Sequence, residues 1–178
     1  MRKRSGVLAA VLKILFLCTG NSARSILAEV LLNELGRGDY AAYSAGSEPA
    51  GAVNPGALDK LRAAGHNIDG LASKSWDEFS GKAAPAFDVV ITVCDNAAGE
   101  SCPVWNGSPV VAHWGIPDPA AFDAGEERRR AFDRAYAQLR TRIEAFLRVP
   151  HNQCTSEEVR AELQRIHERA GDLEGGTR

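Results

Sequence analysis

Cys18 and Arg24 stand with five residues between them, a spacing that lets a sulfur nucleophile and a fixed cation share one loop. A thiol at a helix N-terminus beside a cation has a pKa lowered from about 8.5 to roughly 3.5–7.5, so we expect Cys18 to be largely a thiolate at neutral pH. Arg24 presents a planar fork of donors that suits two oxygens of a tetrahedral oxyanion. Ser25 can donate a hydrogen bond to the sulfur, and Gly20 lets the backbone curl closely around an anion. Residues 18–25 therefore predict a nucleophile within an oxyanion-binding loop, formed by Thr19, Gly20, Asn21, Ser22, Ala23, Arg24 and Ser25.

The hydrophobic period changes across this loop. Residues 11–17 are apolar except for Lys13, which predicts a strand buried on both faces. Apolar residues then recur at helical spacing over 27–35, and Gly36 predicts the end of that helix. A loop between such a strand and such a helix faces backbone N–H groups and the positive end of the helix dipole. A buried cysteine with an unrelated surface arginine, the simpler interpretation, would not require this context.

The rest of the chain alternates strand and helix patterns. Further strands are predicted at 40–44, 88–93 and 110–114, and helices at 54–65 and 126–147. This alternation predicts an α/β fold, with a parallel sheet covered by helices on both faces. Active sites of such sheets lie beyond the carboxyl ends of the strands. We therefore expect three residues that each follow a predicted strand to meet at one edge: Cys18, Cys94 and Asp118.

Cys94 and Cys102 are separated by seven small or polar residues, which predict a flexible loop. Structural zinc usually takes cysteines with two to four residues between them and needs a second pair, so we expect no metal site. A mobile segment could instead carry Cys94 to an adduct on Cys18 and then bring Cys102 to Cys94. Two unreactive thiols are the alternative, and Cys154 has no evident partner.

Asp118 lies between two prolines, a rigid mount from which a carboxyl group could protonate a leaving oxygen as a general acid. The alternative is a turn aspartate that does no chemistry. We interpret His113, on a predicted buried strand, as a hydrogen-bonded core residue rather than a base.

The chain has 178 residues, of which 44% are hydrophobic, and a net charge of -2 at pH 7. That charge argues against nucleic-acid binding, which needs an excess of clustered cations. No apolar run approaches the ~20 residues of a membrane span, and Lys13 interrupts the apolar stretch that follows the basic residues 2–4. We therefore predict a cytoplasmic protein without a membrane segment, and we expect a monomer.

We place one catalytic domain at residues 11–149 and a helical C-terminal tail at 150–178. A capping box at 155–158 predicts the start of a polar helix that reaches about residue 170. The thin apolar stripe of this helix predicts loose packing or a role in association. We expect the chain from Glu174 onward to be disordered.

Four segments taken together resemble the arsenate reductases built on the low-molecular-weight tyrosine phosphatase fold. They are residues 17–25, residues 43–46, Cys94 with residues 102–103, and residues 113–119. The resemblance extends over about residues 13–147. It implies a three-layer sandwich with a four-stranded parallel sheet of flavodoxin-like order, and no tightly bound cofactor.

The resemblance also implies a mechanism. Arsenate binds in the loop against Arg24, Cys18 attacks arsenic, and Asp118 protonates the departing oxygen. Cys94 then attacks the Cys18 sulfur, which releases arsenite. Cys102 attacks Cys94 in turn and leaves a Cys94–Cys102 disulfide that thioredoxin reduces at the protein surface.

The family pattern is not met at every position. Some members bind potassium near the loop, and three residues here match their ligands: Asn21, Glu29 and Ser44. Lys74 and Trp76 stand where a threonine and an aspartate complete that site. We hypothesise that the Lys74 ammonium replaces the metal. The spacing between Cys94 and Cys102 is one residue longer than in thioredoxin-coupled members, which leaves glutathione or another low-molecular-weight thiol open as the reductant.

Two other functions remain open at this point. A low-molecular-weight phosphotyrosine phosphatase would need Cys18, Arg24, Ser25 and Asp118, but neither Cys94 nor Cys102. Those phosphatases usually carry aromatic residues after the Asp-Pro pair, where Ala120 and Ala121 follow here. A catalytically silent oxyanion-binding module is the second alternative, and the intact pair of Cys18 and Arg24 argues against it.

Overall fold

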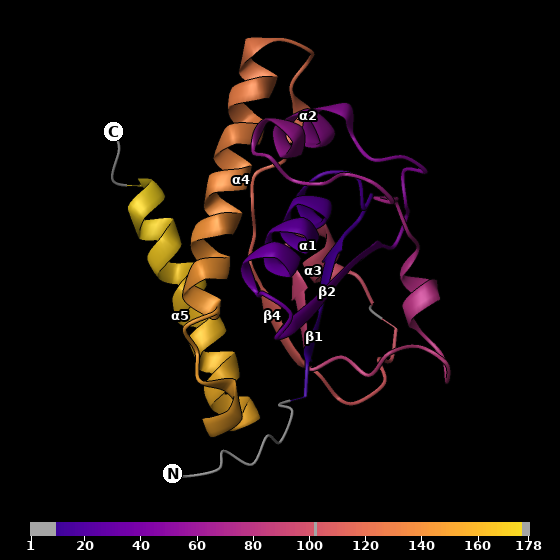
Figure 1. Ribbon diagram of the computed structural model, residues 1–178, viewed down its shortest axis with the longest axis vertical. Coiled ribbons are helices and arrows are strands. Elements are labelled where there is room, and N and C mark those ends of the chain that lie inside the picture. Colours follow the sequence, from indigo (N-terminus) through magenta and orange to yellow (C-terminus); the bar gives the residue numbers. More distant parts are fainter. Residues whose placement is uncertain (1–9, 102, 176–178) are drawn as a thin grey trace, which may run out of the picture.

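Four parallel strands form the centre of the computed structural model, which describes residues 10–101 and 103–175 (Figure 1). They are β1 (Leu12–Cys18), β2 (Tyr40–Gly46), β3 (Val89–Thr92) and β4 (Val110–His113), in the spatial order β2-β1-β3-β4. β1 pairs with both β2 and β3, so Leu17 lies opposite Ala45 on one side and Thr92 on the other. The predicted α/β fold with a four-stranded parallel sheet is confirmed. The carboxyl ends of β1, β3 and β4 therefore meet at one edge of the sheet.

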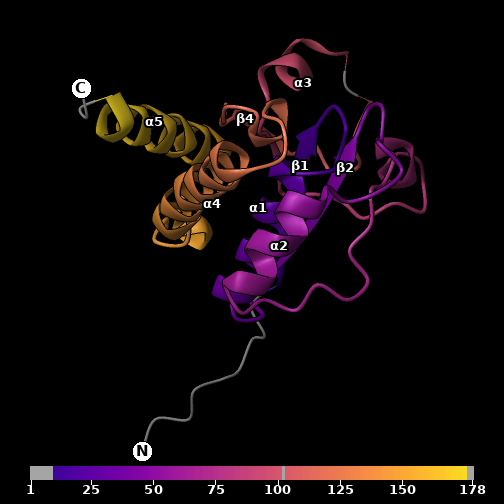
Figure 2. The same cartoon turned by 90° about the horizontal axis from the view of Figure 1, so that it is seen from above.

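Helices cover one face of this sheet. Buried residues of α1 (Arg24–Leu35), α4 (Glu126–Phe146) and α5 (Ser156–Gly175) pack against Ile14 and Phe16 of β1 and Ile91 of β3 in one core cluster. Seen from above, α4 and α5 lie side by side, with α2 (Pro55–Ala63) next to α1 (Figure 2). The opposite face holds a smaller cluster in which Leu15 and Leu17 contact aromatic residues near the short 3-10 helix η1 (Trp76–Phe79). Both faces of β1 are therefore buried, as its continuous apolar run predicts.

Two adjacent residues determine where α2 starts, and one of them also connects this helix to the loop of residues 18–25. The Asn54 side chain accepts a hydrogen bond from the Gly56 N–H at 2.9 Å, and Pro55 occupies the first turn. The backbone N–H of Asn54 also donates to the Ser22 carbonyl at 2.8 Å. The helix predicted to start at these residues is confirmed, and the hydrogen bond from its N-cap to Ser22 holds it against the loop of residues 18–25.

The C-terminal helix α5 packs more closely than its composition predicts. Leu163 is fully buried, and Val159 and Ile166 are also buried within the main core cluster. The Trp114 indole donates a hydrogen bond to the Leu163 carbonyl at 3.1 Å. The expectation of loose packing is wrong because the apolar stripe, although thin, lies against both α4 and β4. Helix α5 continues to Gly175, beyond the expected onset of disorder, and residues 176–178 lie outside the described part.

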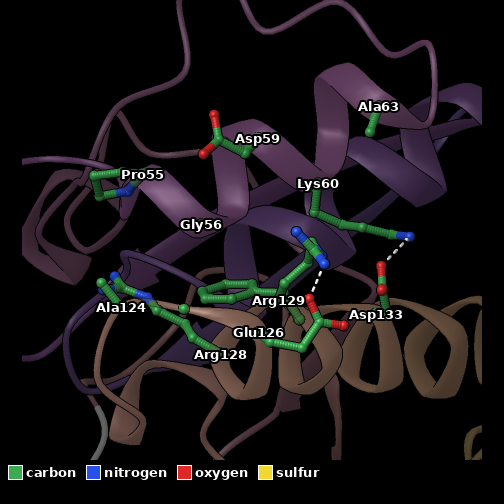
Figure 3. A pocket seen from close by; sticks show the side chains of 12 residues that line it. Pro55, Gly56, Asp59, Lys60, Ala63, Ala124, Glu126, Arg128, Arg129 and Asp133 are labelled. Atoms are coloured by element: carbon green, nitrogen blue, oxygen red, sulfur yellow. Dashed lines mark hydrogen bonds and ion pairs between the residues drawn. The ribbon is translucent and has the colours of Figure 1, made fainter.

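A cavity of about 580 Å³ lies between α2 and α4 (Figure 3). Charged side chains on its walls pair with each other, Lys60 with Asp133 at 2.6 Å and Arg129 with Glu126. None of its lining residues belongs to the segment 18–25. The cavity is thus separate from the loop for which the sequence predicts chemistry.

Gly56, on the wall of this cavity, is needed for the packing of α2 on α4. A Cβ atom at this position would lie 2.7 Å from Cδ2 and 3.0 Å from Cζ of Phe132. We expect Gly56→Ala to lower the free energy of unfolding by roughly 1–2 kcal/mol, because overpacking costs about 1–3 kcal/mol and the better helix propensity of alanine returns at most about 1. Urea unfolding measures the change. Gly171→Ala is the control, since a Cβ there meets nothing within 4 Å, and it should leave stability equal or higher.

Neither a membrane-spanning helix nor a metal-binding cluster is found in the described residues. Across 10–101 and 103–175, no helix combines the length and apolar character that a membrane span requires. Within the same ranges, no group of three or more His, Cys, Asp or Glu side chains is arranged to hold a metal ion.

Candidate active site

The three residues expected at one edge of the sheet come from the ends of three strands. Cys18 is the last residue of β1, Cys94 follows β3 by two residues, and Asp118 follows β4 in the loop before the short 3-10 helix η2 (Pro119–Ala121). Cys18 and Cys94 are both buried, whereas Asp118 is half-exposed. The Thr19 hydroxyl, on the residue next to Cys18, lies 3.7 Å from the Cys94 sulfur, which places Cys94 beside the loop.

The Cys18 sulfur is surrounded by hydrogen-bond donors. The backbone N–H of Asn21 donates to it at 3.2 Å, and the Ser25 hydroxyl lies 2.8 Å away. The Asn21 side-chain amide donates to that same hydroxyl at 2.9 Å, so the single proton of Ser25 is left to point at the sulfur. Both contacts favour a negative charge on Cys18.

Asn21 holds the loop in an unusual backbone conformation. Its φ is 40°, in the left-handed region that asparagine tolerates better than most residues. Its side chain is fully buried, and its Oδ1 accepts the Lys74 N–H at 2.7 Å. Asn21 thus links the loop to a distant segment while directing its own N–H at the sulfur.

The backbone of the loop comes very close to Gly46 of β2, whereas Gly20 has no such close neighbour. A Cβ on Gly46 would lie 2.9 Å from the Asn21 nitrogen and 3.0 Å from the Cys18 carbonyl oxygen. A Cβ on Gly20 would meet only ordinary contacts, the nearest being Ser22 Oγ at 3.7 Å. The packing of the loop against β2 therefore requires glycine at position 46, whereas no contact with residues 10–101 or 103–175 requires it at position 20.

Burial raises the pKa of the Cys18 thiol, contrary to the lowered value expected from its position. Desolvation is the largest cause, and the hydrogen bonds from Ser25 act against it. Arg24 contributes the smallest lowering effect. Its guanidinium is directed elsewhere, with Nη1 donating to the Ile116 carbonyl at 3.0 Å and Nη2 3.4 Å from a carboxylate oxygen of Asp118. The sequence pattern could not reveal the burial that outweighs these stabilising contacts.

This raised pKa predicts how alkylation of Cys18 depends on pH. A thiol is neutral below its pKa, so a raised pKa means that the reactive thiolate is populated only at higher pH. We expect the rate of Cys18 carboxamidomethylation to rise continuously from pH 6 to beyond pH 8.5, the ordinary range of a thiol. Mass spectrometry of the Cys18 peptide measures this rate. Ser25→Ala should shift the profile to still higher pH, and a rate that levels off near pH 6 would contradict the expectation.

Asp118 combines a structural contact with an ion pair. One carboxylate oxygen accepts the Ala120 N–H at 3.0 Å and caps η2, as a turn aspartate would. The other oxygen faces Arg24. The side chain is 44% exposed, so its carboxyl group is accessible from solvent while it stays close to the loop. This geometry allows Asp118 to act as a general acid, and the same side chain also makes the capping contact of a turn aspartate.

Cys94 directly precedes the short helix α3 (Asp95–Gly99). This helix occupies part of the segment that the sequence predicts to be a flexible loop. The Cys94 sulfur accepts the Ala97 N–H at 3.4 Å and thereby caps this helix. The Thr19 hydroxyl lies 3.7 Å from the same sulfur. Cys102 lies outside the described residues, so its predicted approach to Cys94 remains a prediction.

His113 connects β4 to α3 and is hydrogen-bonded, as its strand position suggests. Its Nδ1 lies 2.8 Å from the Thr92 hydroxyl, and its Nε2 lies 3.0 Å from Asp95. Asp95 directly follows Cys94 in the chain. His113 therefore fixes the beginning of α3 on the sheet.

A model of the family described as low molecular weight phosphotyrosine protein phosphatase matches residues 13–165. The chain belongs to this family. The matched range includes the first half of α5, consistent with the burial of Val159 and Leu163 in the main core cluster.

Relatives of this chain include an arsenate reductase from Halalkalibacterium halodurans. It is 36% identical over 134 residues, which cover 75% of this chain and 93% of the relative. A solved structure described as an arsenate reductase in the phosphate binding state superimposes with a TM-score of 0.63 and 28% identity, over 76% of this chain and 96% of that one. A low molecular weight tyrosine phosphatase from T. tengcongensis has a TM-score of 0.60 over 75% of this chain and 95% of its own, and at 20% identity it supports the fold alone. The resemblance to arsenate reductases of this family is confirmed.

The Lys74 ammonium lies beside a residue that the family resemblance predicts as a potassium ligand. Lys74 Nζ lies 3.1 Å from Glu29 Oε2, and the Ser44 hydroxyl donates to the same carboxylate oxygen. The Lys74 backbone N–H binds Asn21, so one residue reaches both the carboxylate and the loop. The three residues that match the potassium ligands therefore do gather around Lys74, whereas Trp76 lies in η1.

The contacts of two residues at this site do not follow from the sequence. Gly46 belongs to residues 43–46, which contribute to the resemblance, but its steric role depends on the loop that crosses it. Glu100 lies in a polar stretch that predicts a surface loop, yet the Thr19 hydroxyl donates to its Oε1 at 3.1 Å. A carboxylate beside the oxyanion-binding loop of this family member could not be placed without knowing how the chain folds after Cys94.

Proposed function

We propose that this protein reduces arsenate to arsenite through Cys18, with Cys94 as the thiol that resolves the adduct. The observation that carries the proposal is the position of Cys94, buried at the end of the strand next to Cys18 and 3.7 Å from Thr19 in the loop. A phosphatase does not need a second thiol at this place. The arsenate reductases among the relatives support the same assignment.

A disulfide between Cys18 and Cys94 is compatible with the strand geometry. The Val93 N–H donates to the Leu17 carbonyl at 2.8 Å, so the pairing of β1 with β3 continues to this point. Adjacent strands are about 4.8 Å apart and rise about 3.3 Å per residue, which places the two Cα atoms about 6 Å apart. A disulfide spans Cα separations of ~4.4–6.8 Å. The spacing of the two residues is therefore within the range of a disulfide, and the bond also requires the Cys94 side chain to turn toward Cys18, because successive residues of a strand point to opposite faces.

In the first step the Cys18 thiolate attacks arsenic within the loop. Backbone N–H groups of residues 19–25 and the Arg24 guanidinium hold the oxyanion, and donors aimed at developing charge are a large source of catalysis. An As–S bond forms and an As–O bond breaks. Asp118 supplies the proton with which the oxygen leaves as water. Ser25 stabilises the Cys18 thiolate before attack and again when it departs.

In the second step Cys94 attacks the Cys18 sulfur. The S–S bond forms, the S–As bond breaks, and its electron pair stays on arsenic, which is reduced from As(V) to As(III) and leaves as arsenite. Cys102 then attacks Cys94, forms the Cys94–Cys102 disulfide and returns Cys18 to the thiolate. Thioredoxin, or glutathione or another small thiol, reduces this last disulfide. The relay needs no tightly bound cofactor, and a reducing cytoplasm is the compartment that supplies such thiols.

Disulfide mapping tests this proposal. Reduced protein is mixed with arsenate without an external reductant, alkylated, and examined by mass spectrometry beside Cys94→Ser and Cys102→Ser variants. We expect a Cys94–Cys102 bond in the parent and a trapped Cys18–Cys94 bond in Cys102→Ser. The proposal fails if arsenate leaves every thiol free while aryl phosphate is turned over rapidly, since that result identifies a phosphatase.

The Lys74 ammonium serves in this proposal as a built-in cation that orders the loop. Its contacts with Glu29 and, through its backbone, with Asn21 occupy the place of a bound potassium ion. We expect arsenate reduction to change less than about twofold when sodium replaces potassium at constant ionic strength. Steady-state rates in matched chloride buffers measure this, and a strong dependence on potassium would refute the role of Lys74.

A further inference from the structure

The second step of the proposed relay requires Cys94 to lose a proton. A thiolate, not a thiol, attacks sulfur. Cys94 is 3% exposed, so bulk water has little access to its S–H group. Two polar groups lie next to its sulfur, the Ala97 N–H at 3.4 Å and the Thr19 hydroxyl at 3.7 Å. The N–H can stabilise the thiolate once it has formed but cannot accept the proton.

The direction of the hydrogen bonds around Thr19 follows from its single hydroxyl proton. Thr19 donates that proton to Glu100 Oε1 at 3.1 Å, because an ionised carboxylate can only accept. The hydroxyl has no second proton for Cys94, so the contact between them can only have the thiol as donor. The three groups thus form one chain of donors and acceptors that leads from Cys94 through Thr19 to Glu100.

Glu100 is held where it can end this chain. It follows α3 directly, and its backbone N–H donates to the Ala97 carbonyl at 3.4 Å, so Cys94 and Glu100 sit at the two ends of one short helix. Its second oxygen, Oε2, is buried and has no hydrogen-bond partner among residues 10–101 and 103–175. A buried carboxylate oxygen without a partner is costly. Glu100 therefore ends the chain with an acceptor oxygen that the described residues do not engage.

We propose that Glu100 accepts, through the Thr19 hydroxyl, the proton that Cys94 loses when it attacks Cys18. The Cys94 proton passes to Thr19 Oγ1 as the Thr19 proton passes to Glu100, so the hydroxyl is regenerated and the carboxylate becomes a neutral acid. The Cys94 thiolate then forms the S–S bond, and the electron pair of the S–As bond stays on arsenic. Glu100 acts through Thr19 and touches no reacting atom. This inference rests on the proposed function, because it assigns a role within the same relay.

Other ionisable groups around Cys94 do not offer the same path. Cys18 cannot take the proton, because its sulfur is bonded to arsenic at this step, and Arg24 is a cation engaged by Asp118. Asp95, next to Cys94 in the chain, pairs with His113 on β4. Of the carboxylates that approach this region within the described residues, Glu100 is the one joined to the Cys94 sulfur by an intervening hydroxyl.

A single-turnover experiment in the Cys102→Ser background tests the proposal. Saturating arsenate is added to the reduced protein, the reaction is quenched and alkylated at intervals, and the Cys18–Cys94 disulfide is quantified between pH 6 and pH 9.5. We expect Glu100→Gln to slow disulfide formation at neutral pH by a factor of about 10²–10⁴, the usual contribution of proton transfer. The deficit should shrink as pH rises, because hydroxide can then remove the proton. Thr19→Val should reproduce the defect, and Thr19→Ser should restore the rate.

Glu48→Gln is the matched control. Glu48 is an exposed residue whose backbone N–H donates to the Thr19 carbonyl at 3.0 Å, so it contacts the same residue through its backbone and not through its carboxylate. It should keep the parental rate and pH profile. Hydrolysis of p-nitrophenyl phosphate, which requires Cys18 but not Cys94, reports whether the Glu100→Gln and Glu48→Gln variants retain an intact loop.

The outcomes separate this inference from the proposed function. A parental rate in Glu100→Gln overturns the inference, as does an equal reduction at every pH or a matching loss of aryl phosphate hydrolysis. If the Cys102→Ser parent itself forms no Cys18–Cys94 disulfide, the proposed function fails, and the inference fails with it.

Discussion

Replacing Cys18 by serine is expected to eliminate both arsenate reduction and aryl phosphate hydrolysis, whereas replacing Cys94 by serine should eliminate only the reduction. Both reactions begin with the Cys18 thiolate, and a serine hydroxyl at the same place is far less acidic and has no adjacent base to activate it. The attack of Cys94 comes later and is needed only to remove arsenic with its electron pair. Arsenite release and p-nitrophenol release measure the two activities on the same preparations.

The control for these variants is Cys154→Ser. Cys154 is a free, partly buried thiol in the segment before α5, remote in the chain from the loop. It should keep both activities within about twofold of the parent. Loss of aryl phosphate hydrolysis in Cys94→Ser would mean that Cys94 supports the structure of the loop, and retention of arsenate reduction in that variant would exclude it as the resolving thiol.

Arg24→Lys is expected to lower kcat/KM for arsenate and for aryl phosphate by a factor of about 10²–10³, the usual effect of removing one donor to a developing oxyanion. Lysine keeps the positive charge but loses the planar fork. The Arg24 guanidinium donates to the Ile116 carbonyl at 3.0 Å through one nitrogen and lies 3.4 Å from Asp118 through another. A lysine ammonium cannot make both contacts with the same geometry, so the positions of the cation and the acid should both change.

Arg129→Lys provides the comparison for this substitution. Arg129 also pairs with a carboxylate, that of Glu126, but its side chain is 71% exposed on α4 and lines the cavity between α2 and α4 (Figure 3). Exposed pairs of this kind contribute about 0–1 kcal/mol to stability. Both activities should be unchanged in this variant. An Arg24→Lys variant with parental kcat/KM would show that charge alone, without the fork, is sufficient for oxyanion binding.

The sequence predicts the elements that position the site, because hydrophobic periodicity and helix capping depend on residues that are close together in the chain. The apolar run over 11–17 placed β1 within one residue, and the helical spacing over 27–35 gave the end of α1 and placed its start within three residues. The rule that active sites lie at the carboxyl ends of parallel strands then placed Cys94 and Asp118 at the correct edge. Asn54 and Pro55 were sufficient to locate the start of α2.

Properties that depend on the packed environment did not follow from the sequence. The pKa of Cys18 was expected to fall because the motif shows nearby donors, but burial, which raises it, depends on residues from several elements. The tail helix was judged by the width of its apolar stripe, although Leu163 shows that even a thin stripe can be completely covered. Glu100 had no pattern of its own, since its contact with Thr19 joins residues 81 positions apart.

The adjacency of β1 and β3 has an evolutionary consequence. A chain with the oxyanion-binding loop after β1 can form a covalent adduct on sulfur, and water is then its only means of releasing the product. The residue two positions beyond the end of β3 lies beside that adduct, so a single change to cysteine at this place introduces an intramolecular competitor at high effective concentration. The change from a hydrolytic ancestor to a reductase would then require little remodelling of the loop itself. Reductases are therefore expected to arise from this scaffold repeatedly and by few substitutions.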